Sequence, residues 1–121
     1  MRCVFVETKW FTKSLPDFFS SDQDYADFQN YLSDQPDKGD VIEGSGGLRK
    51  IRWADKKRGK GKRGGCRVLY LHVPDYCRTL LIEVYGKNEQ EDFSANDLKE
   101  FKTLVQEYKE TLSQNQPKNR R

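Results

Sequence analysis

Three cationic side chains are spaced so that they could act together on one phosphate. Lys50 and Arg52 alternate with apolar residues in a stretch that predicts a strand, and Arg67 lies near the start of a second such stretch. If the two strands pair, we expect the three cations to gather on an uncovered face of the sheet. Like charges on adjacent strands are unfavourable unless an anion lies between them. The group could stabilise a pentacoordinate phosphorane, although ordinary surface charge would give the same pattern.

Two further residues end the last predicted strand, where they could reach the same place. Lys87 could contact a phosphate or transfer a proton. Tyr85 could stack on a base or act as an acid, but tyrosine more often fills core or edge space. The candidate catalytic residues are therefore Lys50, Arg52, Arg67, Tyr85 and Lys87.

These residues belong to or adjoin an unusually basic part of the chain. The segment 48–70, LRKIRWADKKRGKGKRGGCRVLY, holds ten Lys and Arg against the single acid Asp55, a charge of +9. The whole chain is only +3, so the remainder sums to −6. Such a concentration of cations attracts a polyanion, most commonly nucleic acid.

A glycine-rich loop, 55–65, carries six of these cations and has no apolar residue. A solvated hairpin loop is the simple interpretation, but a loop selected only for solubility would mix the signs of its charges. Its sequence matches neither a Walker A nor a Rossmann phosphate-binding pattern. We expect its cations to grip phosphates of a nucleic acid: Lys56, Lys57, Arg58, Lys60, Lys62 and Arg63.

The elements that would position these residues follow from periodicity and from the Ser-x-x-Asp pattern of a helix N-cap, which occurs at Ser21 and at Ser94. Strands are predicted at 2–7, 48–54, 66–73 and 78–85, and helices around 10–15, at 22–34 and at 95–113. Pro16 should interrupt the first helix, and 41–47 reads as a glycine-rich connection. The order β-α-α-β-β-β-α predicts an α+β fold, with a curved, mainly antiparallel sheet and helices packed on one face.

Length and composition favour one small domain, 1–113, followed by a basic, disordered tail, 114–121. No window approaches 18 apolar residues, and the N-terminal charges are too mixed for a signal peptide. Cys3, Cys66 and Cys77 match no zinc or redox motif, so we expect three reduced strand residues in a cytosolic protein. His72 cannot form a metal site alone, and a structural or surface role is expected. We expect neither metal nor cofactor.

In combination, three segments resemble the RelE/ParE toxin superfamily, most closely its HigB branch of mRNA-cleaving toxins. They are GDVIEGSGGLRKIRWA, GKGKRGGCRVLYLH and LLIEVYGKNEQEDFS, followed by the C-terminal helix. The resemblance runs to about residue 112 and includes the order of elements. It implies a bacterial, cytoplasmic type II toxin that binds the ribosomal A site and cuts mRNA there. The RNA 2′-hydroxyl would be the nucleophile, without metal.

By the same resemblance, the phosphate-binding and proton-transfer positions fall on Lys50, Arg52 and Arg67, and a further cation falls on Lys87. The loop cations would then grip ribosomal RNA. The implied partner is a cognate HigA-like helix-turn-helix antitoxin, which neutralises the toxin and with it represses their operon. Many relatives carry Tyr or His where this chain has Phe93, which cannot move a proton. Lys50, Tyr85 and Lys87 remain the candidates for base and acid.

Two other functions fit parts of this pattern. A non-catalytic nucleic-acid-binding module would use the same basic strands and loop without chemistry. A ParE-like toxin would inhibit DNA gyrase through protein contacts, and it would not need the cationic cluster on the sheet for chemistry.

Overall fold

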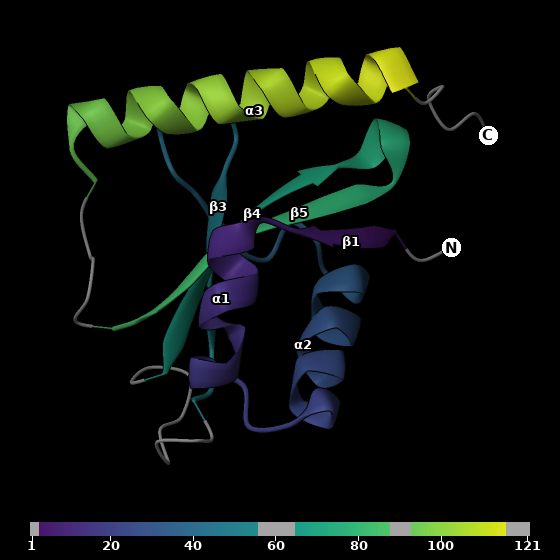
Figure 1. Cartoon of the computed structure of the whole chain (residues 1–121), viewed down its shortest axis with the longest axis vertical. Coiled ribbons are helices and arrows are strands. Elements are labelled where there is room, and N and C mark those ends of the chain that lie inside the picture. Colours follow the sequence, from purple (N-terminus) through teal and green to yellow (C-terminus); the bar gives the residue numbers. More distant parts are fainter. Residues whose placement is uncertain (1–2, 56–64, 88–92, 116–121) are drawn as a thin grey trace.

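A computed structural model describes residues 3–55, 65–87 and 93–115, and its elements follow one another in a simple order (Figure 1). Over these residues the elements are β1 (Val4–Glu7), α1 (Lys9–Phe18), α2 (Asp22–Asp34), β2 (Asp40–Val41), β3 (Arg49–Trp53), β4 (Cys66–Val73), the 3-10 turn η2 (Pro74–Tyr76), β5 (Arg78–Gly86) and α3 (Ala95–Asn115).

The strands form one open, mixed sheet in the order β1-β5-β4-β3-β2. β1 runs parallel to β5, and the other neighbours are antiparallel. The predicted α+β class is therefore confirmed. The nearly apolar strand β5 lies inside the sheet, as its composition indicates.

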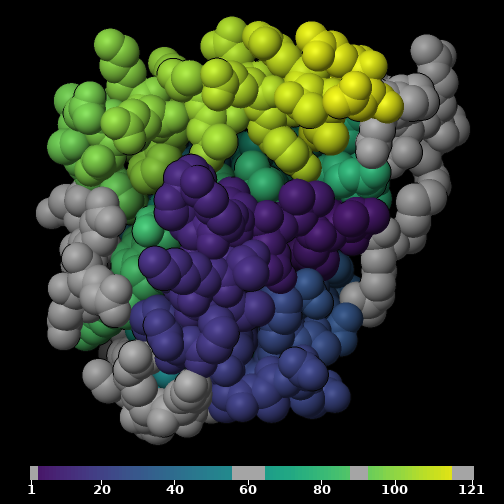
Figure 2. Space-filling model, in the orientation of Figure 1, coloured from purple at the N-terminus to yellow at the C-terminus, as the bar shows by residue number. Residues whose placement is uncertain are grey.

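The helices cover both faces of the sheet, so the prediction that they pack on one face is wrong. α1 and α2 pack on the face that carries Val68 and Tyr70. α3 packs on the opposite face, against Leu69 and Leu71, and crosses the sheet apart from the other two helices (Figures 1 and 2). The cause lies in β4 and β5, which are apolar on both sides and need cover on both.

Most predicted boundaries hold within two residues. The helix at 22–34 and the strand at 66–73 are confirmed, and α3 continues to Asn115, two residues into the predicted tail. Residues 116–121 and Arg2 lie outside the described residues. The Ser-x-x-Asp caps are confirmed as well, because the Ser21 and Ser94 hydroxyls accept the backbone N–H groups of Asp24 and Asp97 at 3.1 and 3.0 Å.

Two local predictions are wrong. Pro16 lies inside α1, which ends two residues later. A proline so close to the end removes little helical bonding, and the buried Phe18 and Phe19 hold this end of the helix on the core. The segment 41–47 is not only a connection, because its first residue, Val41, ends a short edge strand, β2. This strand pairs Asp40 with Lys50 and Val41 with Arg49. Two exposed residues give no hydrophobic pattern from which a strand could be predicted.

The cysteines are not three reduced strand residues, because Cys3 and Cys77 form a disulfide. Parallel pairing sets Val4 opposite Arg78, so the residues just before these two come together, with their Cα atoms 4.5 Å apart. Cys66 is free and buried in β4, as predicted. Among the described residues no helix is long and apolar enough to cross a membrane. Location in the bacterial cytoplasm stays a prediction.

Candidate nucleic-acid interface

The predicted site residues form a row across three strands. On β3, Arg52 lies opposite Arg67 of β4, and Arg67 lies opposite Tyr85 of β5. Residues directly opposite one another share a face of the sheet, and Lys50 shares it because it is two residues from Arg52. The structure thus brings four of the five predicted catalytic residues onto one face, as their alternation indicates.

The sequence predicted that this face is uncovered. That prediction is wrong, because α3 packs on this face. Tyr85 belongs to the apolar cluster that includes Val105 of α3. Burial differs along the row: Arg52 is exposed, whereas Arg67 and Tyr85 are only 2% and 4% exposed. The expectation of an open cationic face therefore holds on β3 and is wrong on β4 and β5.

Arg67 has a structural role in this arrangement. Its Nη1 donates a hydrogen bond to the carbonyl oxygen of Gly65, 3.1 Å away, at the start of β4. A buried guanidinium needs such acceptors, because each unsatisfied donor costs free energy. Tyr85 fills core space, which is the commoner role of tyrosine.

The accessible cations are Arg52 and Lys87, which are exposed, and Lys50, which is half-buried. Lys87 directly follows β5. Within the described parts of the chain, these three side chains make no hydrogen bond or ion pair. They are the described residues of the predicted site that an incoming phosphate would meet first. The six loop cations predicted to grip RNA, residues 56–63, lie outside the described residues.

Arg49, another cation of the basic segment, points elsewhere and fixes the chain before β2. Its Nη1 donates to the carbonyl oxygens of Asp37 and Gly39, at 3.1 and 2.7 Å, and its Nη2 lies 3.6 Å from the Asp37 carboxylate. Sequence reasoning missed this role, because it counted Arg49 only as charge.

Tyr70 of β4 fixes the same segment through two hydrogen bonds of its hydroxyl group. Its hydroxyl donates to the Pro36 carbonyl oxygen at 2.7 Å and accepts the Gly39 N–H at 3.0 Å. Burial raises the pKa of Tyr70, so the hydroxyl stays neutral and can make both bonds. A Cβ at Gly39 would lie 2.8 Å from the Tyr70 hydroxyl oxygen, so this close approach requires glycine. No local signal in the sequence could have found this contact, because Gly39 and Tyr70 are 31 residues apart.

Two hollows open beside Lys50 at the β2 edge of the sheet. One, of about 320 Å³, has Lys50 and Phe93 among its lining residues, and Phe93 packs edge-on against Phe101 with ring centroids 5.2 Å apart. The other is about 390 Å³ and is lined by Tyr31, Lys38, Gly39, Asp40, Lys50, Ile51 and Arg52. Phe93, which only the family resemblance suggested as a site position, thus lines a hollow together with Lys50.

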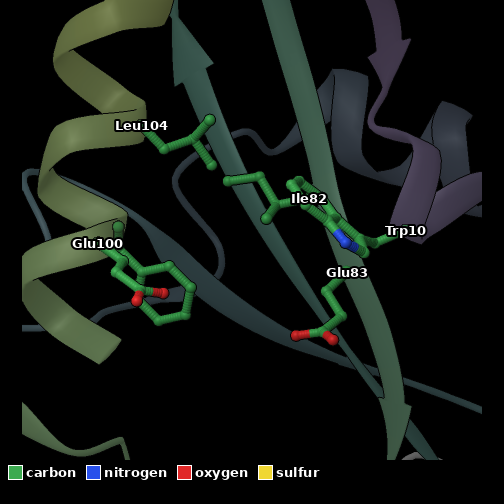
Figure 3. A pocket seen from close by; sticks show the side chains of 6 residues that line it. Trp10, Ile82, Glu83, Glu100 and Leu104 are labelled. Atoms are coloured by element: carbon green, nitrogen blue, oxygen red, sulfur yellow. The ribbon is translucent and has the colours of Figure 1, made fainter. Parts of the chain in front are cut away.

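A third hollow, of about 340 Å³, lies between α1, β5 and α3 (Figure 3). Its polar groups include the carboxylates of Glu83 and Glu100, and Trp10 forms one wall with 54% of its surface exposed. Two carboxylates repel a phosphate, so this hollow does not suit nucleic acid. The site is better placed at the β2 edge, where the cations are.

Two acids of the described residues, Asp24 and Asp55, are buried, in contrast to the exposed cation Arg52. Asp24 accepts hydrogen bonds from Trp53 Nε1 at 3.4 Å and from the Ser20 N–H at 3.1 Å. Asp55 is buried close to Cys66. Burial, followed by the charge of Asp55, raises the pKa of the Cys66 thiol to about 12.

His72 lies half-buried on β4, where its Nδ1 is 3.0 Å from the Thr79 hydroxyl oxygen. Burial lowers its pKa, which favours the neutral ring and fits a structural role. In the described ranges, no three His, Cys, Asp or Glu side chains are grouped so that they could hold a metal ion.

No protein-family model matches the sequence.

Proposed function

We propose that this protein is a ribosome-dependent endoribonuclease of the HigB branch of the RelE/ParE toxins, which cleaves mRNA in the ribosomal A site. The observation that carries the proposal is the pair of cations on one face of β3, the exposed Arg52 and the half-buried Lys50, in line with Arg67 on β4. The +9 charge of segment 48–70 supports a polyanionic substrate. The resemblance described above supplies the reaction and the ribosome.

In the proposed reaction, the RNA 2′-oxygen bonds to the adjacent phosphorus while the bond from phosphorus to the next 5′-oxygen breaks. The products are a 2′,3′-cyclic phosphate and a free 5′-hydroxyl. A base accepts the proton of the 2′-hydroxyl, and an acid protonates the leaving oxygen. No metal ion takes part in this proposal.

The accessible cations have the clearest roles in that chemistry. Arg52 offers a planar set of donors to two phosphate oxygens, and Lys50 adds a second charge to stabilise the phosphorane. Lys50, Lys87 and Tyr85 remain the candidates for base and acid. We propose that the ribosome completes the site by holding the mRNA in a reactive geometry.

A cognate HigA-like antitoxin with a helix-turn-helix domain is the proposed partner in a bacterial cytoplasm. It would neutralise the toxin and, bound to it, repress their operon.

One observation favours a second candidate, a non-catalytic nucleic-acid-binding module. Arg67 and Tyr85 are buried, which leaves Lys50, Arg52 and Lys87 as the accessible members of the predicted catalytic set. Three accessible cations suffice to bind phosphates and do not by themselves break a bond. A ParE-like gyrase inhibitor has no observation of this kind in its favour.

Primer-extension mapping of mRNA in a purified translation system, with and without ribosomes, tests the proposal. We expect cuts at codon-spaced positions that appear only when ribosomes translate the message. Arg52→Ala should reduce cleavage by roughly 100-fold, whereas Lys13→Ala, which removes an exposed cation from α1, should leave it unchanged. Ribosome binding without cuts would favour the binding module. Inhibited supercoiling without cuts would favour the gyrase inhibitor.

A further inference from the structure

Of the two hollows at the β2 edge, the one of about 390 Å³ is lined by an aromatic ring, cations and one acid. Phosphate binding alone does not require this combination. The half-buried Tyr31 of α2 is one of the lining residues. Its ring packs against Trp53, with ring centroids 5.5 Å apart and ring planes inclined by 44°. Trp53 packs in turn edge-on against Phe28 at 5.3 Å. Tyr31 thus packs on the core through Trp53, while part of the residue remains accessible.

Charged residues line the same hollow, which opens at the edge of β3 between the face of Trp53 and the opposite face that carries Lys50 and Arg52. Lys38, Lys50 and Arg52 supply three cations, of which Lys38 and Arg52 are exposed. Asp40 is the one acid among the lining residues, and it is exposed. Asp40 lies opposite Lys50 across the β2–β3 pair.

The position of this hollow is fixed by the rest of the fold. Arg49 and Tyr70 hold residues 36–39 against the sheet through the bonds described above. β2 pairs only with Arg49 and Lys50, so Ile51 and Arg52 continue beyond it and form a wall of the hollow. A ligand would meet a preformed notch and not a surface that must first be assembled.

We propose that this notch, defined by Tyr31, Lys38, Asp40 and Arg52, is a subsite for one nucleotide of single-stranded RNA. The base stacks on Tyr31, as bases stack on aromatic rings in single-strand-binding proteins. Lys38 and Arg52 hold its flanking phosphates. Asp40 accepts a hydrogen bond from an exocyclic amino group, which cytosine, adenine and guanine carry and uracil lacks. A volume of about 390 Å³ is sufficient for a nucleotide.

This inference rests on the proposed function for its RNA substrate, and it adds a base-selective position next to the cleavage site. A phosphate-binding surface alone would be indifferent to base identity. The acid is the informative residue, because a carboxylate in a purely phosphate-binding notch would weaken the binding.

Binding can be measured apart from cleavage with short oligonucleotides whose 2′-hydroxyls are methylated, since these cannot supply the nucleophile. Fluorescence anisotropy should show that the protein binds a 2′-O-methyl oligocytidylate several-fold more tightly than the matched oligouridylate, because the two differ in the group at position 4. Asp40→Asn should abolish most of that difference. Tyr31→Leu should weaken binding of both by about tenfold.

Tyr76→Leu is the matched control, because Tyr76 is a half-buried tyrosine of η2 that lines none of these hollows. It should bind both oligonucleotides as the unaltered protein does. Asp40→Asn changes one exposed residue and serves as the second test if Tyr31→Leu does not fold.

Equal affinity of the unaltered protein for cytidylate and uridylate, or a Tyr31→Leu variant that binds as tightly as Tyr76→Leu, would overturn the subsite. If ribosome-dependent cleavage persisted in that case, the proposed function would stand without it. Loss of cleavage in Arg52→Ala together with unchanged cytidylate selectivity in Asp40→Asn would likewise reject only the subsite. Absence of cleavage by the unaltered protein would reject the proposed function itself.

Discussion

Arg52 and Arg67 lie opposite each other on the adjacent strands β3 and β4, yet they have different roles in the fold. Both belong to the cationic row, but Arg52 is exposed while Arg67 is buried and donates to Gly65. Removing an exposed charge seldom alters stability, whereas removing a buried hydrogen-bonding charge leaves its acceptors unsatisfied. Substitutions at these two positions therefore test different things.

At this scale we predict that Arg67→Ala lowers the free energy of unfolding by about 2 kcal/mol or more, while Arg52→Ala changes it by less than about 0.5 kcal/mol. Urea denaturation followed by circular dichroism measures both. Loss of cleavage in Arg67→Ala would then be read only after correction for the unfolded fraction. Equal stability of the two variants would contradict the structural role of Arg67.

Cys66 should be unreactive in the native protein because it is fully buried and its thiol pKa is raised to about 12. Alkylation with iodoacetamide at pH 8, counted by mass spectrometry, should add no label to the native oxidised protein. It should add one label after unfolding without reductant and three after unfolding with reductant. A label on Cys66 in the native state would contradict its burial.

The same shift makes stability depend on pH in a defined direction. The folded protein holds the Cys66 proton more tightly than the unfolded chain, whose thiol titrates near 9.0. The neutral thiol's contribution is therefore complete below about pH 9 and is lost as the pH rises toward about 12. A Cys66→Ala variant should lack this part of the alkaline loss.

Among the elements, β2 is short but decides the shape of the proposed interface. Its two residues pair with β3, and the preceding segment is fixed by Arg49 and Tyr70 rather than by further strand pairing. The notch beside Ile51 exists because the pairing stops there.

For this element we predict that Tyr70→Phe lowers the free energy of unfolding by about 1–3 kcal/mol, because it removes the donor to Pro36 and the acceptor for Gly39. It should also weaken binding of 2′-O-methyl RNA by releasing Lys38 and Asp40 from their positions. Calorimetry and anisotropy measure the two effects. Tyr108→Phe on α3 is the control for removal of a tyrosine hydroxyl, and full stability of Tyr70→Phe would show that the segment is held by other contacts.

At the scale of the whole molecule, two features stand out: an uneven distribution of charge along the chain and a disulfide between residues distant in sequence. The basic segment carries +9 and the remainder −6, so one part attracts RNA while the rest repels it. At the ends of β4 and β5 opposite to the Cys66–Gly86 pair, the Cys3–Cys77 disulfide ties the chain before β1 to the start of β5, across 74 residues of sequence.

The charge distribution predicts that affinity for RNA falls steeply with salt, because several counterions are released on binding. Anisotropy titrations between 50 and 200 mM salt should give roughly a hundredfold loss or more. Lys38→Ala should reduce the slope of log affinity against log salt by about one. An affinity that hardly changes over this range would contradict phosphate binding.

Reduction of the disulfide should lower the free energy of unfolding by about 2–4 kcal/mol, because it frees a long loop in the unfolded chain. Urea denaturation with and without dithiothreitol measures the loss, and Cys3→Ser should reproduce it without reductant. If Cys3→Ser were as stable as the oxidised protein, the link would contribute nothing to the fold.

Local pattern alone determined much of this protein. Periods of two and 3.6 residues located four strands and the helices at 22–34 and 95–113, and Ser21 and Ser94 marked where these helices begin. The alternation Lys50-Ile51-Arg52-Trp53 also determined that the two cations share a face, because successive side chains of a strand point to opposite sides.

Only the tertiary structure decided what covers each face and which side chains remain accessible. β4 and β5 are apolar on both sides, so no local pattern says that α3 crosses to the face of Arg67 and Tyr85 and lies apart from α1 and α2. The disulfide, the Tyr70 contact with Gly39 and the notch at β2 join residues distant in sequence. These features form only when the elements pack together in three dimensions, and neither the periodicity nor the composition of the sequence describes that packing.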